Sequence, residues 1–235
     1  YKLAIQNHKK NNLEIKKNFY YKVLEIDPIH LGANNNLGAL SRQKGESQKA
    51  ISFFEKVIKI NPEYKNAYIN LGMLSQQLGE NEKAISCYEK VVKINPNHEN
   101  SYINLGILYH ELGENEKSIS SYEKVIAINP NNNIAHNNLG AIFAELGKTE
   151  QASTFFKKAI EINPQYESAY NNLGELFRLS GENKKAISCY EKVITINPNS
   201  LEALINVANL HISQLDDLKK AISSSYKVHK LQQEK

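Results

Sequence analysis

The feature that most constrains the fold of this chain is an internal repeat of 34 residues. A Leu-Gly pair returns at this interval, and so does a proline that follows Asn or Asp. The leucines of the pairs are Leu37, Leu71, Leu105, Leu139 and Leu173, and the prolines are Pro28, Pro62, Pro96, Pro130, Pro164 and Pro198. A fixed period of roughly 20–50 residues is typical of a solenoid, because each unit buries its apolar face only against its neighbours.

Each repeat carries two helical patterns when residues 99–132 are counted as positions 1–34. Apolar or small residues at positions 4, 7, 8, 11 and 14 have helical spacing, and positions 20, 24, 27 and 28 repeat it after a break. Glycine at position 15 suits the left-handed residue that closes a helix. Asn, Ser or Thr at position 17 is expected to cap the second helix, and proline at position 32 to end it. The sequence therefore predicts a helix-turn-helix in each repeat.

This 34-residue unit resembles the tetratricopeptide repeat, through its aromatic residues at positions 4, 11 and 24, Leu-Gly at 7 and 8, alanine at 20 and proline at 32. The resemblance covers essentially the whole chain. It implies an all-α fold, a right-handed α-solenoid of about seven repeats. In that family positions 8 and 20 are small because the paired helices approach most closely there. The glycines and alanines at these positions are Gly38, Gly72, Gly140 and Gly174, matched by Ala50, Ala84, Ala152 and Ala186.

The repeats are expected to form a single elongated domain over residues 1–235. Repeat 1, residues 1–30, is truncated, with Asn11 in place of the turn glycine and Lys16 in place of the small residue. Repeats 2–6, residues 31–200, keep the period without insertion. The chain begins inside a first helix, so we expect it to be part of a longer protein.

The last segment, residues 201–235, is a degenerate repeat and is expected to close the array. Leu215 replaces the turn glycine, and one residue is inserted before Ala221. The apolar residues expected on a capping helix are Leu218, Ile222 and Val228.

Composition and motifs argue against several functions. The net charge is +4 and the lysines are interspersed among glutamates, so the sequence predicts no continuous basic surface of the kind that binds nucleic acid. No apolar stretch approaches the roughly 18 residues of a membrane span. No nucleophile motif, phosphate-binding loop or metal-ligand spacing occurs, so we predict no enzymatic activity, no cofactor and no metal. Cys87 and Cys189, three repeats apart, are expected to be free thiols, which favours a reducing, cytoplasmic location.

The most informative surface is the face of each first helix that points away from its partner, at positions 2, 6, 9 and 13. In the tetratricopeptide family this face lines a concave groove. Position 6 is asparagine in six consecutive repeats, which we call the asparagine ladder: Asn36, Asn70, Asn104, Asn138, Asn172 and Asn206. Asparagine is a mediocre helix former, so this repetition points to a role. Two readings stay open, namely that the amides hold a partner's backbone or that they pack neighbouring repeats together.

An apolar patch is expected beside the ladder in repeats 3 and 4. Its residues occupy positions 5 and 9 and are Ile69, Met73, Ile103 and Ile107, with Ile134 at position 2 of repeat 5. The groove is expected to be polar toward the C-terminal end, through Asn137, Asn171, Glu175 and Arg178, and toward the N-terminal end, through Asn35, Arg42 and Gln43. An apolar centre with a polar rim is the usual anatomy of a binding surface.

The sequence thus predicts a protein-interaction scaffold that binds an extended peptide segment in its groove, without nucleic-acid or membrane partners. A primary amide offers a donor and an acceptor, so each ladder residue is able to engage a peptide backbone. The alternative is the substrate-recognition arm of a larger enzyme, resembling the protein glycosyltransferases of the O-GlcNAc transferase type whose repeat superhelix carries such a ladder. A second copy of the chain is a further possible partner, bound through the terminal repeats.

Overall fold

The computed structural model describes residues 2–213, 223 and 225–230. These residues lie in α-helices or in short links between them, and none of them belongs to a strand. The all-α fold predicted from the repeat pattern is therefore confirmed. Within this described part of the chain, no helix is both long enough and apolar enough to cross a membrane.

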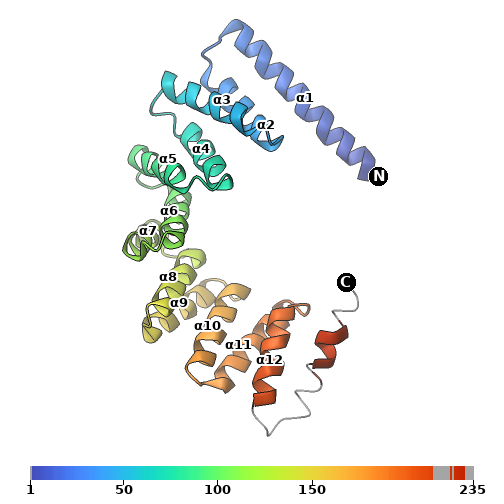
Figure 1. The fold of residues 1–235 in the computed structure, drawn as a ribbon, viewed down its shortest axis with the longest axis vertical. Coiled ribbons are helices and arrows are strands. Elements are labelled where there is room, and N and C mark those ends of the chain that lie inside the picture. The colour runs from blue at the N-terminus through green and yellow to red at the C-terminus, as the bar shows by residue number, and fades with distance from the viewer. Residues whose placement is uncertain (1, 214–222, 224, 231–235) are drawn as a thin grey trace. The chain divides into compact units, whose positions relative to one another are not determined.

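The chain divides into two compact units, residues 1–113 and 114–235 (Figure 1). The helices of the first unit are α1 (Lys2–Ile26), α2 (Leu31–Gln43), α3 (Ser47–Ile60), α4 (Lys65–Gln77), α5 (Asn81–Ile94) and α6 (Glu99–Glu111). Those of the second unit are α7 (Asn115–Ile128), α8 (Asn133–Glu145), α9 (Thr149–Ile162), α10 (Glu167–Leu179), α11 (Asn183–Ile196) and α12 (Leu201–Ser213). Residues 223 and 225–230 are also helical.

Within each unit the helices pack in chain order, as a solenoid requires. The helices of one repeat pair closely, α2 with α3 and α4 with α5 in the first unit, and α8 with α9 and α10 with α11 in the second. Each second helix also packs on the first helix of the next repeat. First helices of neighbouring repeats touch as well, α2 with α4 and α8 with α10. The single domain over all 235 residues stays a prediction.

The turns inside the repeats follow the expected glycine chemistry. Each position 15 glycine has a φ between +72° and +77°, the left-handed region that side chains rarely adopt. Their residues are Gly45, Gly79, Gly113, Gly147 and Gly181. This confirms the prediction that glycine closes the first helix.

The links between repeats are built around the Asn-Pro pair. Each asparagine before the proline has an extended backbone, so the second helix ends there as predicted. The side chain of each such asparagine accepts a hydrogen bond from the backbone N–H two residues later, as Asn61 does from Glu63 at 2.9 Å. The other residues of this kind are Asn95, Asn129, Asn163 and Asn197.

The predicted cap at position 17 is wrong. The second helices already begin at that position, with Ser47 in α3 and Thr149 in α9 as the first helical residues. The residue before it, such as Glu46, is the N-cap and makes no capping bond with its side chain. The reason is the turn itself, because the N–H of Glu46 bonds back to the carbonyl of Ser41 and its own carbonyl accepts the first helical bond, from Ala50.

The closest approach of paired helices is made by an aromatic ring over a glycine. A Cβ atom built on Gly140 would lie 2.6 Å from two ring atoms of Phe156, and one on Gly38 would lie 2.5 Å from Phe54. These rings come from position 24, while the position 20 alanines, such as Ala152, are fully buried beside them. The glycine at position 8 is thus required by the position 24 ring.

Repeat 1 departs from the predicted helix-turn-helix. Helix α1 runs unbroken through Asn11, and among the described residues only glycines adopt a positive φ. A side chain disfavours the left-handed conformation that the turn requires, so Asn11 does not replace the glycine. Folding the chain back would also press the charged Lys16 into the contact that alanine makes elsewhere, whereas Lys16 is exposed here. As a result Phe19, at position 23, is 64% exposed, while Cys87 at the same position of repeat 3 is 6% exposed.

The predicted cap lies mostly outside the described residues, which include neither Leu215 nor Leu218 nor Ile222. Val228 is described, and it is half-buried in a helical segment.

The packing of glycine against the aromatic ring gives a stability prediction. Replacing Gly140 by alanine places a methyl group against the Phe156 ring, and overpacking of this kind costs about 1–3 kcal/mol. Urea unfolding of Gly140→Ala is expected to show this loss. Phe156→Leu in the same chain opens room, so the double variant should lose less than the sum of the two single variants. Strict additivity would contradict the contact.

The two cysteines give a pH prediction. Both are free and buried, and burial raises the pKa of Cys87 and of Cys189 to about 11 from 9.0. Unfolded thiols release their protons from about pH 9, while the folded ones keep theirs up to about pH 11. The stabilisation by the buried thiols is therefore complete below pH 9 and is lost as the pH rises toward 11. We expect the melting temperature of Cys87→Ala/Cys189→Ala to fall less steeply over this range than that of the wild type; identical slopes would contradict this.

Candidate functional site

The candidate site is the free face of the first helices, α2, α4 and α6 in the first unit and α8, α10 and α12 in the second. The six ladder residues lie on these helices, one on each, and every one of them is half-buried. Half-burial leaves part of each amide accessible while neighbouring side chains surround the rest. The contacts of the amides therefore decide what they are able to offer to a partner.

Two ladder residues bond to an asparagine of the preceding repeat. The Nδ2 of Asn70 donates to Oδ1 of Asn35 at 3.0 Å in the first unit, and Nδ2 of Asn172 donates to Oδ1 of Asn137 at 2.9 Å in the second. Both acceptors occupy position 5 and are buried. These bonds join first helices of adjacent repeats, α2 to α4 and α8 to α10.

Two other ladder residues bond to a tyrosine of the preceding repeat instead. The Nδ2 of Asn138 donates to the hydroxyl of Tyr122 at 3.0 Å. Asn104 bonds the hydroxyl of Tyr88, which also donates to Oε1 of Gln76 at 3.4 Å. Burial raises the pKa of Tyr88 to about 12, and the bond from Asn104 acts in the opposite direction. This hydroxyl stays protonated at neutral pH.

The choice between these partners follows the aromatic residue at position 24. Where it is phenylalanine, in repeats 2 and 5, position 5 of the same repeat is asparagine, and its Oδ1 accepts the hydrogen bond from the ladder amide of the next repeat. Where it is tyrosine, in repeats 3 and 4, position 5 is isoleucine and the hydroxyl takes the bond. One N–H of each of these four amides is thus satisfied by the protein itself. For Asn70 and Asn172, the Oδ1 atom and the second N–H remain for a partner.

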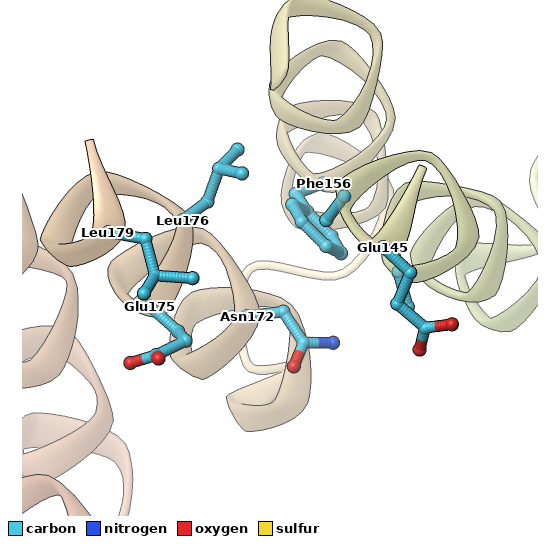
Figure 2. Close-up of a pocket in the computed structure, with 8 residues that line it drawn as sticks. Glu145, Phe156, Asn172, Glu175, Leu176 and Leu179 are labelled. Atoms are coloured by element: carbon cyan, nitrogen blue, oxygen red, sulfur yellow. The ribbon is translucent and has the colours of Figure 1, made fainter. Parts of the chain in front are cut away.

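A pocket of about 290 Å³ opens on the same face in the second unit (Figure 2). Phe156 and Glu145 lie on one side of it, and Leu176 and Leu179 of α10 on the other, with the ladder residue Asn172 between them. Leu179 is 70% exposed, which is unusual for a large apolar side chain. The complete lining is Ala141, Ala144, Glu145, Phe156, Asn172, Glu175, Leu176 and Leu179.

The charge at the edge of this pocket is fixed. The carboxylate of Glu175 accepts two bonds from Arg178, from Nε at 2.7 Å and from Nη2 at 2.6 Å, and one from the Tyr190 hydroxyl at 3.2 Å. The bonds from Arg178, and then that from Tyr190, hold the pKa of Glu175 below its usual range although partial burial opposes them. The group is therefore ionised at neutral pH and its orientation is held.

The predicted apolar patch is partly accessible. Ile69 and Met73 lie on α4, and Ile103 and Ile107 on α6; Met73 is 38% exposed and the three isoleucines are half-buried. Ile134 belongs to α8 of the second unit, where it is 41% exposed. Each of these residues is thus able to contact a partner with part of its side chain.

Sequence reasoning missed the pocket because it treated the groove of repeats 5 and 6 as polar. Asn137 is in fact buried, whereas Glu175 and Arg178 form an exposed ion pair at the edge of an apolar pocket. The signal was present, since repeat 5 alone has alanine at both positions 9 and 12, Ala141 and Ala144. The two alanines face repeat 6, which has Leu179 at position 13, and their small side chains leave a space between the two repeats.

Asn206 lines a second pocket, of about 360 Å³, with Arg178, Asn183, Asn209 and Leu210. Among the described residues there is no group of three or more side chains suited to hold a metal ion. His136, at an aromatic position, is buried with its ring centroid 6.0 Å from that of Phe155, as expected of a packing residue.

Comparison with protein families agrees with this architecture. Models described as tetratricopeptide repeat match residues 31–64, 63–131 and 132–199. The chain belongs to the tetratricopeptide repeat family. Comparison with curated proteins gives no match.

Several solved structures resemble this tetratricopeptide repeat protein. MamA is 26% identical with a TM-score of 0.64, over 73% of this chain and 93% of MamA. YrrB, described as a repeat protein with an unusual peptide-binding site, is 20% identical with a TM-score of 0.66, over 79% of this chain and 95% of YrrB. A repeat protein from Parabacteroides merdae is 20% identical with a TM-score of 0.70, over 99% and 94%. The last two show likeness of fold, and this fold supports a protein-interaction scaffold.

The alternation of ladder partners gives a prediction for exchanging the residues at positions 5 and 24 of one tetratricopeptide repeat for those of another. Asn137→Ile deprives Asn172 of its acceptor, and adding Phe156→Tyr supplies the hydroxyl that Tyr122 supplies to Asn138. A hydrogen bond of this kind contributes about 1 kcal/mol. We therefore compare the change in the free energy of unfolding in urea that Phe156→Tyr causes in two backgrounds. This change should be more stabilising by about 1 kcal/mol in Asn137→Ile than in the wild type. Equal effects in both backgrounds would contradict the alternation.

Proposed function

We propose that this protein is a non-catalytic scaffold that binds an extended peptide segment along the free face of its first helices. The observation that carries the proposal is the pocket between α8 and α10, because it opens beside Asn172 and brings an apolar cavity and a ladder amide together. A partner's backbone and one of its side chains would be bound at adjacent points.

The ladder supplies the contacts that are independent of sequence. Because Asn70 and Asn172 each donate one hydrogen bond to the neighbouring repeat, their side chains are held in one orientation before a partner binds. Their Oδ1 atoms then accept from a backbone N–H of the partner. Pre-organised side chains lose less conformational entropy on binding, which favours affinity. The packing reading and the binding reading of the ladder are thus compatible.

The apolar residues supply selectivity. A few well-packed apolar anchors typically carry most of the affinity for a peptide, while backbone bonds fix its register. Met73 is the most exposed of the four patch residues in the first unit and is the best candidate for such an anchor. Ile69, Ile103 and Ile107 would border the same segment.

The proposal is tested by removing a ladder bond without leaving an unpaired amide. Asn35→Leu/Asn70→Leu replaces both partners of one bond, which is close to neutral for stability because neither group is left unsatisfied. Wild-type protein is used to select binders from a phage-displayed library of random peptides. Affinities of synthetic copies are then measured by fluorescence polarisation. We expect the double variant to bind all selected peptides that contact the first unit about 10-fold more weakly, the loss of roughly one hydrogen bond.

Two further variants complete this experiment. Met73→Glu should weaken only peptides that carry a large apolar residue, and Gln48→Leu, at an exposed site of the second helix α3 and so outside the free face, should leave all affinities unchanged. If Asn35→Leu/Asn70→Leu binds every peptide at wild-type strength, the ladder has a packing role alone. If the library yields no binder, the proposed function fails.

A further inference from the structure

We propose that the pocket between α8 and α10 binds a basic side chain, lysine or arginine, of the partner segment. This inference rests on the proposed function and names the residue type that the second unit selects. It is drawn from the walls of the pocket, from the charges at its edge and from the way the first unit fills the corresponding space.

The size and walls of the pocket suit a long side chain with an apolar stem. Its volume of about 290 Å³ is at the lower limit of pockets for drug-sized ligands, roughly 300–1,000 Å³, so it fits one side chain better than a larger ligand. The side chains of Ala141, Ala144, Phe156, Leu176 and Leu179 present hydrocarbon to it. Lysine and arginine place their methylene groups along such surfaces and keep the charged end at the polar edge.

The edge of the pocket carries negative charge. Of the eight lining residues, two are glutamates and none is basic. Glu175 is ionised and paired with Arg178, and Glu145 is exposed on the opposite side (Figure 2). Two carboxylates and one guanidinium leave this edge with a net negative charge. A carboxylate has room for several donors, so Glu145 can accept a bond from a partner in addition to any it has within the chain. An acidic side chain of a partner would be repelled here, and a basic one attracted.

The first unit shows a basic side chain at the corresponding place. Position 12, which is Ala144 in repeat 5, is Arg42 in repeat 2. Arg42 is half-buried, its Nη1 atom is buried without a hydrogen-bond partner among the described residues, and its charge acts to lower the pKa of the Tyr88 hydroxyl of α5. The space beside position 12 therefore accommodates a guanidinium supplied by the protein. In repeat 5 alanine leaves that space open to one supplied by a partner.

The experiment uses the full chain and peptides from the library selection described above. For each selected peptide that contains a lysine or arginine, three copies are compared, with lysine, norleucine or glutamate at that site. Norleucine keeps the apolar stem and lacks the charge. We expect lysine to bind about 3–5-fold more tightly than norleucine at low salt, as suits an exposed ion pair, and glutamate more weakly still. The preference should shrink at high salt, because salt screens exposed charges.

Three variants decide whether this preference arises in the pocket. Ala144→Arg should fill the pocket as Arg42 fills its own space and abolish the preference for lysine. Gln151→Arg adds the same charge at an exposed site of α9, where repeats 2, 3, 4 and 6 carry lysine, and should leave the preference intact. Glu145→Gln should reduce the preference to less than 2-fold.

Different failures have different meanings. Selected peptides without a basic residue, norleucine equal to lysine, or an undiminished lysine preference in Ala144→Arg would each overturn this inference. In all three cases peptides are still bound, so the proposed function stands. A library without any binder would overturn both.

Discussion

The structure depends on one contact, the aromatic ring of position 24 lying over the glycine of position 8. A Cβ atom would lie only 2.5 Å from the phenylalanine ring at Gly38 and 2.6 Å from that at Gly140, and 3.0 and 2.9 Å from the tyrosine rings at Gly72 and Gly174, so a methyl group is crowded in every one of these repeats and most in those with phenylalanine. The ring fills the space between the two helices of a repeat and also reaches the first helix of the next one, as Tyr88 does when it packs with Leu105 of α6. In an array whose units bury their apolar faces only against neighbours, such a shared ring couples one repeat to the next.

The same ring sets the polar contacts of the free face. A tyrosine ends in a hydroxyl that takes the ladder amide of the next repeat, whereas a phenylalanine leaves that amide to an asparagine at position 5. In repeat 6 the pattern changes, because the hydroxyl of Tyr190 donates to Glu175 and Oδ1 of Asn171 is buried without a partner among the described residues. A buried polar group without a partner is costly, so this exchange of partners in repeat 6 lowers the stability that the position 24 ring contributes there.

The free face therefore combines rigid and variable features. The ladder amides are similarly placed in each repeat, and four of them are held by the protein's own hydrogen bonds, which is compatible with the proposed recognition of a peptide backbone. The residues at positions 5, 9, 12 and 13 differ between repeats, from Met73 on α4 to Ala144 on α8, and these differences make an apolar surface in one place and a pocket with acidic edges in another. Variation of surface side chains on a constant fold is how one fold serves different partners.

The sequence by itself determined the helices and their turns, because glycine at position 15 and proline at position 32 impose local conformations that hardly depend on the rest of the chain. It also indicated how the helices pair, because the small residue at position 8 recurs opposite the small residue at position 20. It failed at Asn11, where a turn was expected without the glycine that makes it, and at position 17, where the turn had already placed the cap one residue earlier. Tertiary structure alone decided which donor and acceptor atoms of the ladder amides are bonded within the protein, and where a pocket opens. Those properties depend on residues about 16 and 35 positions apart, as with Tyr122 and Asn138 or Asn137 and Asn172, and only packing brings such pairs together.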